Sequence, residues 1–196
     1  MKKLIFATRN NHKLSEVKEI LNGYEVISLK DIGYEYDIDE TGETTEENAE
    51  IKAIAILEYC KNKNIDCAII ADDSGLFVES LNGEPGIHSA RYADDHNEEA
   101  NRQKLLKNLL GVENRSAYFK CSICYADYRG TTLFEGRTYG NITTEKIGSD
   151  AFGYDCLFHS IDLDKTFGQA TDEEKNAVSH RGRALEELKK WLDSKN

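Results

Sequence analysis

Polar side chains that can bind phosphate follow a short apolar stretch at the start of the sequence. Residues 3–7 predict a buried strand, and Thr8, Asn10 and Lys13 come directly after it, before a helix. A hydroxyl, a carboxamide and an ammonium group on a strand-to-helix turn can donate hydrogen bonds to phosphate oxygens, and a helix N-terminus favours anions. The alternative is a capped, solvated helix start. The segment lacks the Gly-Lys-Ser/Thr ending of a P-loop, which argues against that class of NTPase.

Two adjacent carboxylates, Asp72 and Asp73, are the sharpest candidates for a metal site. They follow the apolar residues 67–71, which predict a strand, and they precede Ser74-Gly75, which predicts a turn. An α/β sheet binds its ligands beyond the carboxyl ends of its strands, and carboxylates suit Mg²⁺, a hard cation. Successive strand residues point to opposite faces, so only one of the two is expected to face the site. The alternative is an Asx-type turn that caps backbone N–H groups.

Three further segments carry side chains suited to a nucleotide. The acidic run Asp37–Glu40 offers a second metal ligand, or else a solvated loop. The segment Phe152–Asp155 offers an aromatic face for a base beside a carboxylate, or else a turn onto a core strand. Lys175, His180 and Arg181 form a late cationic cluster, for which the alternative is a capping or surface histidine. Cations for phosphates, acids for a metal and an aromatic loop are together what a nucleoside triphosphate site requires.

Apolar residues at helical spacing predict the helices that position these side chains. Asn10 or Asn11 is the expected first N-cap, the segments Thr44–Glu47 and Thr171–Glu174 are expected capping boxes, and Ser179 is expected to cap a terminal helix. A third helix is expected from about Asn97. The residues expected on the buried faces are Leu14, Val17, Ile20, Leu21, Ala53, Ile56, Leu57, Cys60, Leu105, Leu106, Leu109, Leu110, Ala184, Leu185, Leu188 and Leu192.

Later in the chain, extended segments predict antiparallel structure. Residues 117–128 and 132–140 read as a hairpin joined by Arg129-Gly130, and residues 156–158 read as a core strand. Strands and helices alternate earlier in the chain, so the fold class is α/β with a mixed sheet. No repeat or linker divides the sequence, so one domain over residues 1–196 is expected.

Composition excludes several classes of partner. The formal net charge is −11, from 36 Asp and Glu against 25 Lys and Arg. Such a surface disfavours a nucleic acid polymer, because that binding depends on neutralising phosphates with cations. The apolar runs are too short to span a membrane, and no signal peptide is apparent. Five cysteines without a disulfide framework favour a reducing compartment, so a cytoplasmic location is expected. Cys121 and Cys124 form a CxxC, but no second ligand pair accompanies it, so zinc or redox chemistry is disfavoured.

Five motifs, in order along nearly the whole chain, resemble those of the inosine/xanthosine triphosphate pyrophosphatase family. They are Ala7-Thr-Arg-Asn-Asn-His-Lys13, Ala71-Asp-Asp-Ser-Gly75, Pro85-Gly-Ile-His-Ser-Ala-Arg-Tyr92, Phe152-Gly-Tyr-Asp155 and Lys175-Asn-Ala-Val-Ser-His-Arg-Gly182. The resemblance implies an elongated mixed β-sheet flanked by helices, with two lobes around a central nucleotide-binding cleft, and a homodimer. It also implies Mg²⁺-dependent hydrolysis of ITP, dITP and XTP between the α- and β-phosphates.

The resemblance implies roles for individual residues. Asp39 and Asp73 would bind the metal, and Asp73 would also be the catalytic acceptor that activates water. The triphosphate would be held by Thr8, Arg9, Asn10, Asn11, His12, Lys13 and Lys52. The nucleotide pocket would be lined by Ser74, Phe152, Gly153, Tyr154, Asp155, Lys175, His180 and Arg181.

The sequence departs from the family pattern at two positions and leaves three rival functions open. Cys156 stands where relatives commonly have proline, and Arg9 stands where they often have glycine; neither removes a functional group. The rivals are a Maf-like pyrophosphatase acting on other altered nucleotides, a catalytically silent nucleotide-binding module, and a phosphotransferase. A panel of nucleotides discriminates the Maf-like alternative by its preference, and the products formed from ITP, pyrophosphate or phosphate, discriminate the other two.

Overall fold

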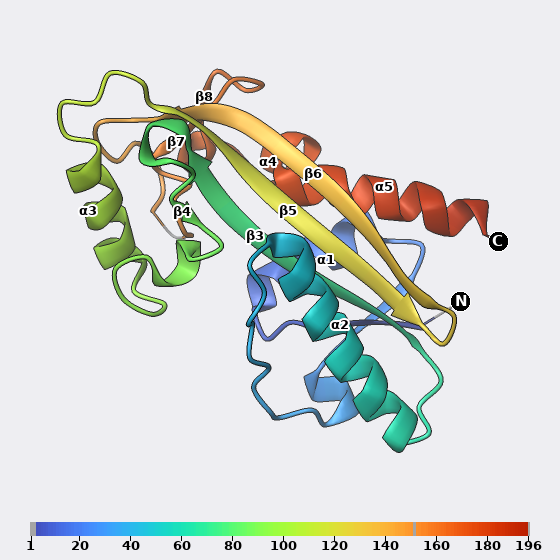
Figure 1. Ribbon diagram of the computed structural model, residues 1–196. Helices are drawn as coiled ribbons and strands as arrows, with labels where there is room; N and C mark the ends of the chain where they lie inside the picture. The colour runs from blue at the N-terminus through green and yellow to red at the C-terminus, as the bar shows by residue number, and fades with distance from the viewer. Residues whose placement is uncertain (1–2, 151, 196) are drawn as a thin grey trace. The chain divides into compact units, whose positions relative to one another are not determined.

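The computed structural model describes residues 3–150 and 152–195. Within these residues eight strands form one sheet in the order β2-β1-β3-β5-β6-β7-β8, with β4 paired to β3 (Figure 1). The strands are β1 (Lys3–Phe6), β2 (Glu25–Ser28), β3 (Ala68–Val78), β4 (Pro85–Gly86), β5 (Ser116–Asp127), β6 (Gly130–Ile142), β7 (Phe158–Ser160) and β8 (Lys165–Thr166). The helices are α1 (Asn11–Ile20), α2 (Thr45–Asn62), α3 (Glu98–Asn108), α4 (Asp172–Val178) and α5 (His180–Ser194).

Strand directions confirm the predicted mixed α/β sheet. β1 runs parallel to β2 and to β3, with Leu4 paired to Ala68 and Phe6 to Ile70. In contrast, β4 is antiparallel to β3, β7 to β6, and β8 to β7. The early parallel strands carry crossover helices and the later strands pair as antiparallel neighbours, as the alternation in the sequence indicated. None of the described helices is long and apolar enough to cross a membrane.

The chain forms two compact units, and each is assembled from separate stretches of sequence. Unit 1 comprises residues 1–73, 121–136 and 182–196, and unit 2 comprises residues 74–120 and 137–181. β3, β5 and β6 therefore each contribute residues to both units.

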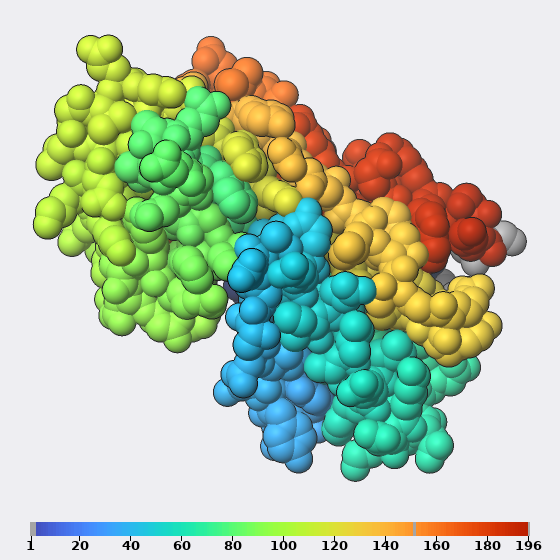
Figure 2. Space-filling view, viewed as in Figure 1, coloured from blue at the N-terminus to red at the C-terminus, as the bar shows by residue number. Residues whose placement is uncertain are grey.

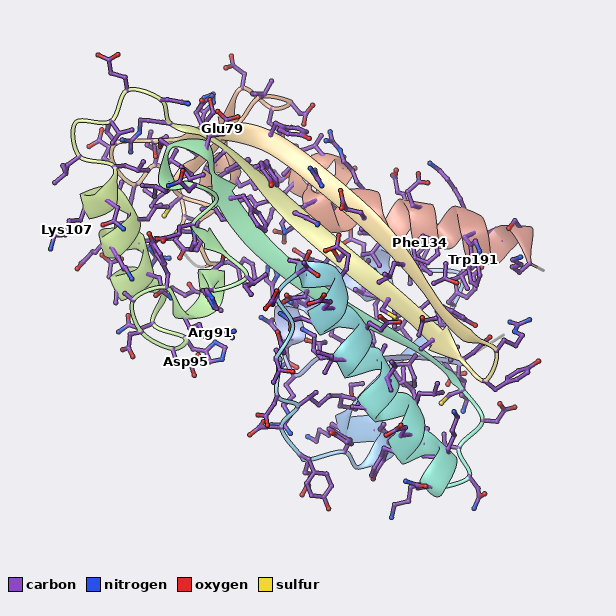
Figure 3. All side chains as sticks on the ribbon, in the orientation of Figure 1. Glu79, Arg91, Asp95, Lys107, Phe134 and Trp191 are labelled. Carbon is purple, nitrogen blue, oxygen red and sulfur yellow. The ribbon has the colours of Figure 1, made fainter. Side chains whose placement is uncertain are left out.

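Unit 1 buries both faces of its strands. On one face Leu4, Phe6 and Ile70 pack against α1 and α5, and on the other Ile5 and Ile69 pack against α2. This alternation follows from the two-residue period of a strand. The outer side of α2 (teal) lies at the surface in Figure 2. On the α5 side, Phe134 of β6 contacts Trp191 with ring centroids 5.7 Å apart, and Figure 3 shows the two rings together.

Unit 2 has a separate apolar core built around aromatic rings. Phe119 of β5 contacts Phe158 of β7, with ring centroids 4.7 Å apart, and stacks on Phe167 at 6.2 Å. Leu105 and Leu109 of the α3 segment complete this core. Tyr154 belongs to this core, and His180 stacks on Phe119, so the core contacts the late aromatic and cationic residues of the sequence.

The predicted turn at Ser74-Gly75 is wrong, because β3 continues through it as a single strand of 11 residues. Gly75 instead allows another backbone to approach closely. A Cβ atom there would lie 2.4 Å from the carbonyl oxygen of Gly86, and Leu76 pairs with Gly86 in β4. Asp72 and Asp73 therefore lie within β3, although they do lie beyond the end of β1, which pairs only as far as Ile70.

Other local predictions need smaller corrections. Leu110 was expected to be buried but is 77% exposed, because α3 ends at Asn108. The hairpin connection is Tyr128-Arg129 rather than Arg129-Gly130, and Asp127 fixes it by accepting a 2.8 Å hydrogen bond from the Arg129 backbone N–H.

The core strand expected at residues 156–158 and the capping box expected at Thr44–Glu47 also differ from expectation. That strand begins at Phe158 rather than at residue 156, because the Leu157 N–H closes a turn onto the Tyr154 carbonyl. The capping box at Thr171 is present. At α2 the Thr44 side chain accepts from the Glu47 N–H, but the Glu47 carboxylate accepts from the Glu43 N–H instead of completing the box.

Candidate active site

Asp72 and Asp73 point to opposite sides of β3, as their adjacency predicted. Asp72 contacts Lys13: the Lys13 Nζ lies 3.0 and 3.1 Å from the two carboxylate oxygens of Asp72. Asp73 meets α2, where it lies within reach of Asn48 and Lys52. Both carboxylates are buried. One strand thus presents an acidic group to α1 and another to α2.

The turn between β1 and α1 places Lys13 in the first turn of that helix. Asn10 is the N-cap, and its side chain accepts hydrogen bonds from the N–H groups of His12 and Lys13 at 2.9 and 3.2 Å. The Thr8 hydroxyl accepts from the Asn10 N–H at 3.1 Å. The capping interpretation therefore holds for Thr8 and Asn10, and it places Lys13 in the first turn of a helix, whose N-terminus favours anions.

Arg9 and His12 extend this turn to neighbouring residues. The Arg9 guanidinium donates to Asp37 Oδ1 at 2.6 Å and to the Tyr36 carbonyl, which ties the turn to the acidic loop. The Nδ1 atom of His12 lies 3.4 Å from the Glu16 carboxylate, one helical turn away. Asn11 begins α1 and is exposed.

Asp73, Lys52 and Glu40 form a second cluster of charges. The Lys52 Nζ lies 2.9 Å from Glu40 Oε1 and 3.6 Å from Asp73 Oδ1. The side-chain amide of Asn48 donates to the other oxygen of Asp73 at 3.2 Å. Asn48 and Lys52 are four residues apart on α2, so they lie on one face of the helix. The ammonium group thus separates two carboxylates.

Burial and neighbouring charge oppose each other at this cluster. Burial raises the pKa of Asp73, while Lys52, Lys13 and the Asn48 hydrogen bond work against that rise. For Lys52, burial alone would lower the pKa, but the carboxylates of Asp73, Asp72 and Glu40 outweigh it and raise the pKa. A carboxyl group with a raised pKa is a better proton acceptor than an ordinary exposed aspartate.

The donor set of this cluster fits a magnesium ion. Mg²⁺ usually binds one or two carboxylates together with phosphate oxygens and waters, so it does not need an all-protein cage. Asp73 and Glu40 supply two carboxylates, one on each side of the Lys52 ammonium group. Among the described residues there is no group of three or more His, Cys, Asp or Glu side chains that could hold a metal. The remaining ligands of such an ion would come from substrate and water.

In unit 2, Lys175 lies among aromatic rings and a carboxylate. Its Nζ donates to Asp155 Oδ2 at 2.6 Å and lies 5.0 Å from the centre of the Phe152 ring. His180, the first residue of α5, stacks on Phe119 with ring centroids 4.9 Å apart. Lys175, His180 and Arg181 are all buried. The surface interpretation of His180 is therefore wrong, and cations and a π-face do gather in this unit.

The segment between Phe152 and Asp155 is held by its backbone and by one tyrosine. Gly153 has φ +49°, a left-handed conformation that suits glycine, and the Tyr154 hydroxyl donates to the Ser89 carbonyl at 2.9 Å. Burial raises the pKa of Tyr154, so this hydroxyl remains a donor. Ser74, also in this unit, has a buried Oγ without a hydrogen-bond partner among the described residues.

Comparison with known proteins identifies the family. Residues 4–191 match the model of the Ham1 family. The chain belongs to the Ham1 family. It is 47% identical to the dITP/XTP pyrophosphatase of Thermoanaerobacter pseudethanolicus, over 97% of this chain and 96% of that protein. It is 48% identical to the dITP/XTP pyrophosphatase of Bacillus licheniformis, over 98% and 99%. The Ham1 protein of Staphylococcus aureus superposes with a TM-score of 0.89 at 40% identity, and the match covers both chains in full.

In this Ham1-family chain the structure brings together some of the predicted site residues and adds others. Lys13 joins Asp72, and Lys52 joins Asp73, within unit 1. Asp39, expected as a metal ligand, is exposed. Sequence reasoning included Glu40 only as one member of the acidic run Asp37–Glu40, and it missed the role of Asn48 in the Asp73 cluster. The four-residue spacing of Asn48 and Lys52 was the available signal, because it places both side chains on one helical face. In unit 2 the structure brings together Phe152, Asp155 and Lys175, and separately His180 and Phe119.

Proposed function

We propose that this chain hydrolyses the non-canonical purine nucleoside triphosphates ITP, dITP and XTP to the nucleoside monophosphate and pyrophosphate. The observation that carries the proposal is the buried Asp73, placed between the Lys52 ammonium and the Asn48 amide. The names of the two pyrophosphatase relatives support the same activity. Removal of such nucleotides would keep deaminated purines out of the nucleotide pool.

Phosphate binding falls to the cations of unit 1. Lys13, Lys52 and the β1–α1 turn of Thr8, Arg9, Asn10, Asn11 and His12 would hold the triphosphate. Asp73 would take the proton from the attacking water, since a buried carboxylate with a raised pKa is suited to that role. Lysine ammonium groups close to the β- and γ-phosphates would stabilise pyrophosphate as it leaves.

Asp73 and Glu40 are the proposed ligands of a Mg²⁺ ion. A bound ion would neutralise phosphate charge and lower the pKa of a coordinated water. The sequence resemblance implies Asp39 in the second position, but Glu40 is the residue whose carboxylate lies 2.9 Å from Lys52. Glu40 is therefore our preferred second ligand, and Asp39 is the alternative that mutation tests.

Recognition of the base falls to the buried residues of unit 2. Phe152 offers a ring face, and Lys175, His180 and Arg181 are donors suited to the O6 atom of hypoxanthine or xanthine. Gly153, Tyr154, Asp155 and Ser74 would shape the pocket. Adenine presents an amino group instead of O6, so buried donors would be left unpaired against it, and such mismatches discriminate strongly.

Location and assembly belong to the same proposal. We infer a cytoplasmic enzyme, because free cysteines suit a reducing compartment. The excess of acidic residues supports small anionic ligands over nucleic acid polymers. The homodimer rests on the sequence resemblance alone. Sedimentation equilibrium of the full chain tests it, and a mass of 22.2 kDa in solution would contradict it.

Hydrolysis of ITP in ¹⁸O-labelled water tests the reaction directly. Attack at the α-phosphorus places the label in the monophosphate and releases unlabelled pyrophosphate, which ³¹P NMR resolves. Release of phosphate, or label in the pyrophosphate, would contradict the proposed bond. A panel of ITP, XTP, ATP, GTP and modified pyrimidine nucleotides separates the proposal from a Maf-like preference.

The Asp73→Asn variant ties the reaction to its proposed acceptor. Asparagine keeps the shape of the side chain but cannot accept the proton, so turnover of ITP should fall by at least about a hundredfold. Near-ultraviolet circular dichroism should be unchanged. A variant that keeps most of its ITP hydrolysis would remove Asp73 from the role.

A further inference from the structure

Arg102 of α3 lies buried in unit 2 and contacts the backbone on both sides of Phe152. Its Nη1 atom donates to the carbonyl of Gly153 at 2.7 Å and to that of Asp150 at 3.3 Å. We propose that Arg102 is a positioning residue for the base, acting through the segment Phe152–Asp155. The inference rests on the proposed function of that segment.

The orientation of the guanidinium is set by acidic groups at the start of α3. Glu99 Oε2 accepts from Arg102 Nε at 3.4 Å and from Nη2 at 3.2 Å. Glu99 is itself fixed by Gln103, at 3.0 Å, and by Lys146, at 3.1 Å. A planar guanidinium held through two of its nitrogens presents the third in a fixed direction. Nη1 is therefore aimed at the two carbonyls.

Arg102 acts on the part of the segment that carries the aromatic ring. Tyr154 is held by its bond to the Ser89 carbonyl, and the Asp155 carbonyl accepts from the Gly168 N–H at 2.9 Å. These bonds fix the second half of the segment. Arg102 fixes the first half, since its two acceptors flank Phe152 and Gly153 has a left-handed φ of +49°.

Loss of the two hydrogen bonds from Arg102 should weaken binding of the base more than it slows hydrolysis. Lys175 binds Asp155 and lies 5.0 Å from the Phe152 ring, so a shifted ring changes the surface that meets a base. Lys13 and Lys52, the proposed phosphate ligands, and Asp73 belong to unit 1, whereas Arg102 and its two carbonyl acceptors belong to unit 2. A small misplacement of a binding group weakens substrate binding even when the reacting groups are intact.

Arg115 provides a matched control in the same unit. Its guanidinium also holds backbone carbonyls, those of Leu109, Ile142 and Thr143, at 2.9, 2.6 and 2.7 Å. None of these acceptors lies in residues 150–155. A purely structural role for a carbonyl-binding arginine should therefore appear equally in both variants, whereas a positioning role should appear only at Arg102.

The experiment compares Arg102→Met, Arg102→Lys and Arg115→Met in the full chain, with ITP and ATP as substrates. We expect Arg102→Met to raise the KM for ITP about tenfold and to reduce the preference for ITP over ATP about tenfold, with kcat within about threefold of wild type. Arg102→Lys should recover part of the loss, because an ammonium can donate to the same carbonyls. Arg115→Met should lower the melting temperature and leave KM and preference unchanged.

Calorimetric titration with IMP measures binding of the base, the ribose and one phosphate, because this product lacks the β- and γ-phosphates. Weaker IMP binding in Arg102→Met but not in Arg115→Met supports the inference. Equal behaviour of the two methionine variants, or a loss of kcat with unchanged KM, overturns it. If Arg102→Met does not fold, Arg102→Lys and Glu99→Gln are compared with Arg115→Met in the same measurements. A wild-type chain that fails to hydrolyse ITP would defeat the proposed function instead.

Discussion

Asn48 shows how a single buried amide can organise two parts of the candidate site. Its oxygen accepts from the Gly42 N–H at 2.8 Å, and its nitrogen donates to Asp73 at 3.2 Å. A backbone N–H can only donate and an ionised carboxylate can only accept, so the orientation of the amide is fixed by its two partners. Asn48 therefore links the loop that carries Glu40 to the carboxylate that we propose as proton acceptor.

Replacement of Asn48 by alanine should reduce turnover by roughly tenfold to a hundredfold, as is usual for residues that orient a metal or catalytic ligand. Thr45→Ala is the matched control on the same helix, because Thr45 and Ser122 share a buried hydroxyl–hydroxyl hydrogen bond of 2.7 Å and the described structure gives neither a hydrogen bond to Asp73. Both changes should lower the urea midpoint, but only Asn48→Ala should lower kcat. Equal kcat values in the two variants would count against the role.

Glu40 and Asp39 offer a test of the metal ligand. If Glu40 is the ligand, Glu40→Gln should raise the Mg²⁺ concentration for half-maximal ITP hydrolysis by about tenfold or more, because a carboxylate is lost from the cluster. Asp39→Asn should change it less than twofold, since Asp39 is exposed. Titration with Mn²⁺, followed by electron paramagnetic resonance, gives the same comparison without turnover. The reverse ranking would restore Asp39.

The sequence could identify this acidic loop but not the ligand within it. Asp39 and Glu40 are adjacent and chemically similar, so composition and spacing treat them alike. What distinguishes them is a tertiary contact, the hydrogen bond from Gly42 to Asn48, which fixes the loop against α2. In contrast, Lys13 and Asp73 were recognisable because each follows an apolar run whose type and direction the local sequence indicates.

At the scale of elements, β3 shows how a glycine can lead to a wrong prediction of a turn. Ser-Gly after two aspartates is typical of a turn, yet the strand continues because the neighbouring strand β4 needs room at Gly75. A turn and a close backbone approach give the same local signal, and only the partner strand distinguishes them. The helices were easier to predict, because their apolar spacing and caps are local: Asn10 and Thr171 cap helices as expected.

Gly75→Ala should destabilise the protein by about 1–3 kcal/mol, the range for overpacking, because the new Cβ would overlap the Gly86 carbonyl. Gly23→Ala is the control, since a Cβ there would meet nothing within 4 Å and its backbone is not left-handed. Urea denaturation measures both. A Gly75→Ala variant as stable as Gly23→Ala would mean that β4 can move away from β3.

The start of α3 should contribute to acid sensitivity. Hydrogen bonds from Gln103, Lys146 and Arg102 lower the pKa of Glu99 to about 2, from an ordinary value of 4.5. Between these values the unfolded chain binds the extra proton, so stability from Glu99 is fully present above pH 4.5 and is lost as the pH falls toward 2.

The Glu99→Gln variant should therefore show a shallower fall in unfolding free energy than wild type as the pH drops from 4.5 to 3. Glu99 is half-exposed, so salt should shrink the difference between the two proteins. Urea titrations at several pH values, with and without 0.5 M NaCl as an approximate screening concentration, measure both effects. Parallel pH curves for the two proteins would contradict the assigned hydrogen bonds.

At the scale of the whole molecule, the residue pattern predicted the α/β class, but only the family resemblance implied two lobes; the pattern itself could not predict the division into two units. Hydrophobic patterning indicates which segments are strands, but strand order depends on contacts between residues far apart in the chain. Unit 1 alone combines residues from both ends of the sequence with part of the β5–β6 hairpin. The order β1-β3-β5-β6 within the sheet follows from this assembly and has no local signature.

Because the two units share three strands, we expect them to unfold cooperatively. Neither unit is a continuous piece of chain, and β3, β5 and β6 supply both cores, so local loss of one core should remove the strands that the other needs. We therefore expect a single unfolding transition. Trp191, the only tryptophan of the sequence, packs against Tyr125 and Phe134 and reports on unit 1. Gly75 belongs to unit 2.

Gly75→Ala should accordingly lower the urea midpoint of Trp191 fluorescence as much as that of far-ultraviolet circular dichroism, although the substitution lies in unit 2. The fluorescence and dichroism curves should superimpose in wild type and in the variant. If the substitution shifts only part of the dichroism curve and leaves the Trp191 transition in place, the units unfold separately. The expectation of one domain over residues 1–196 would then give way to two domains that share a sheet without sharing stability.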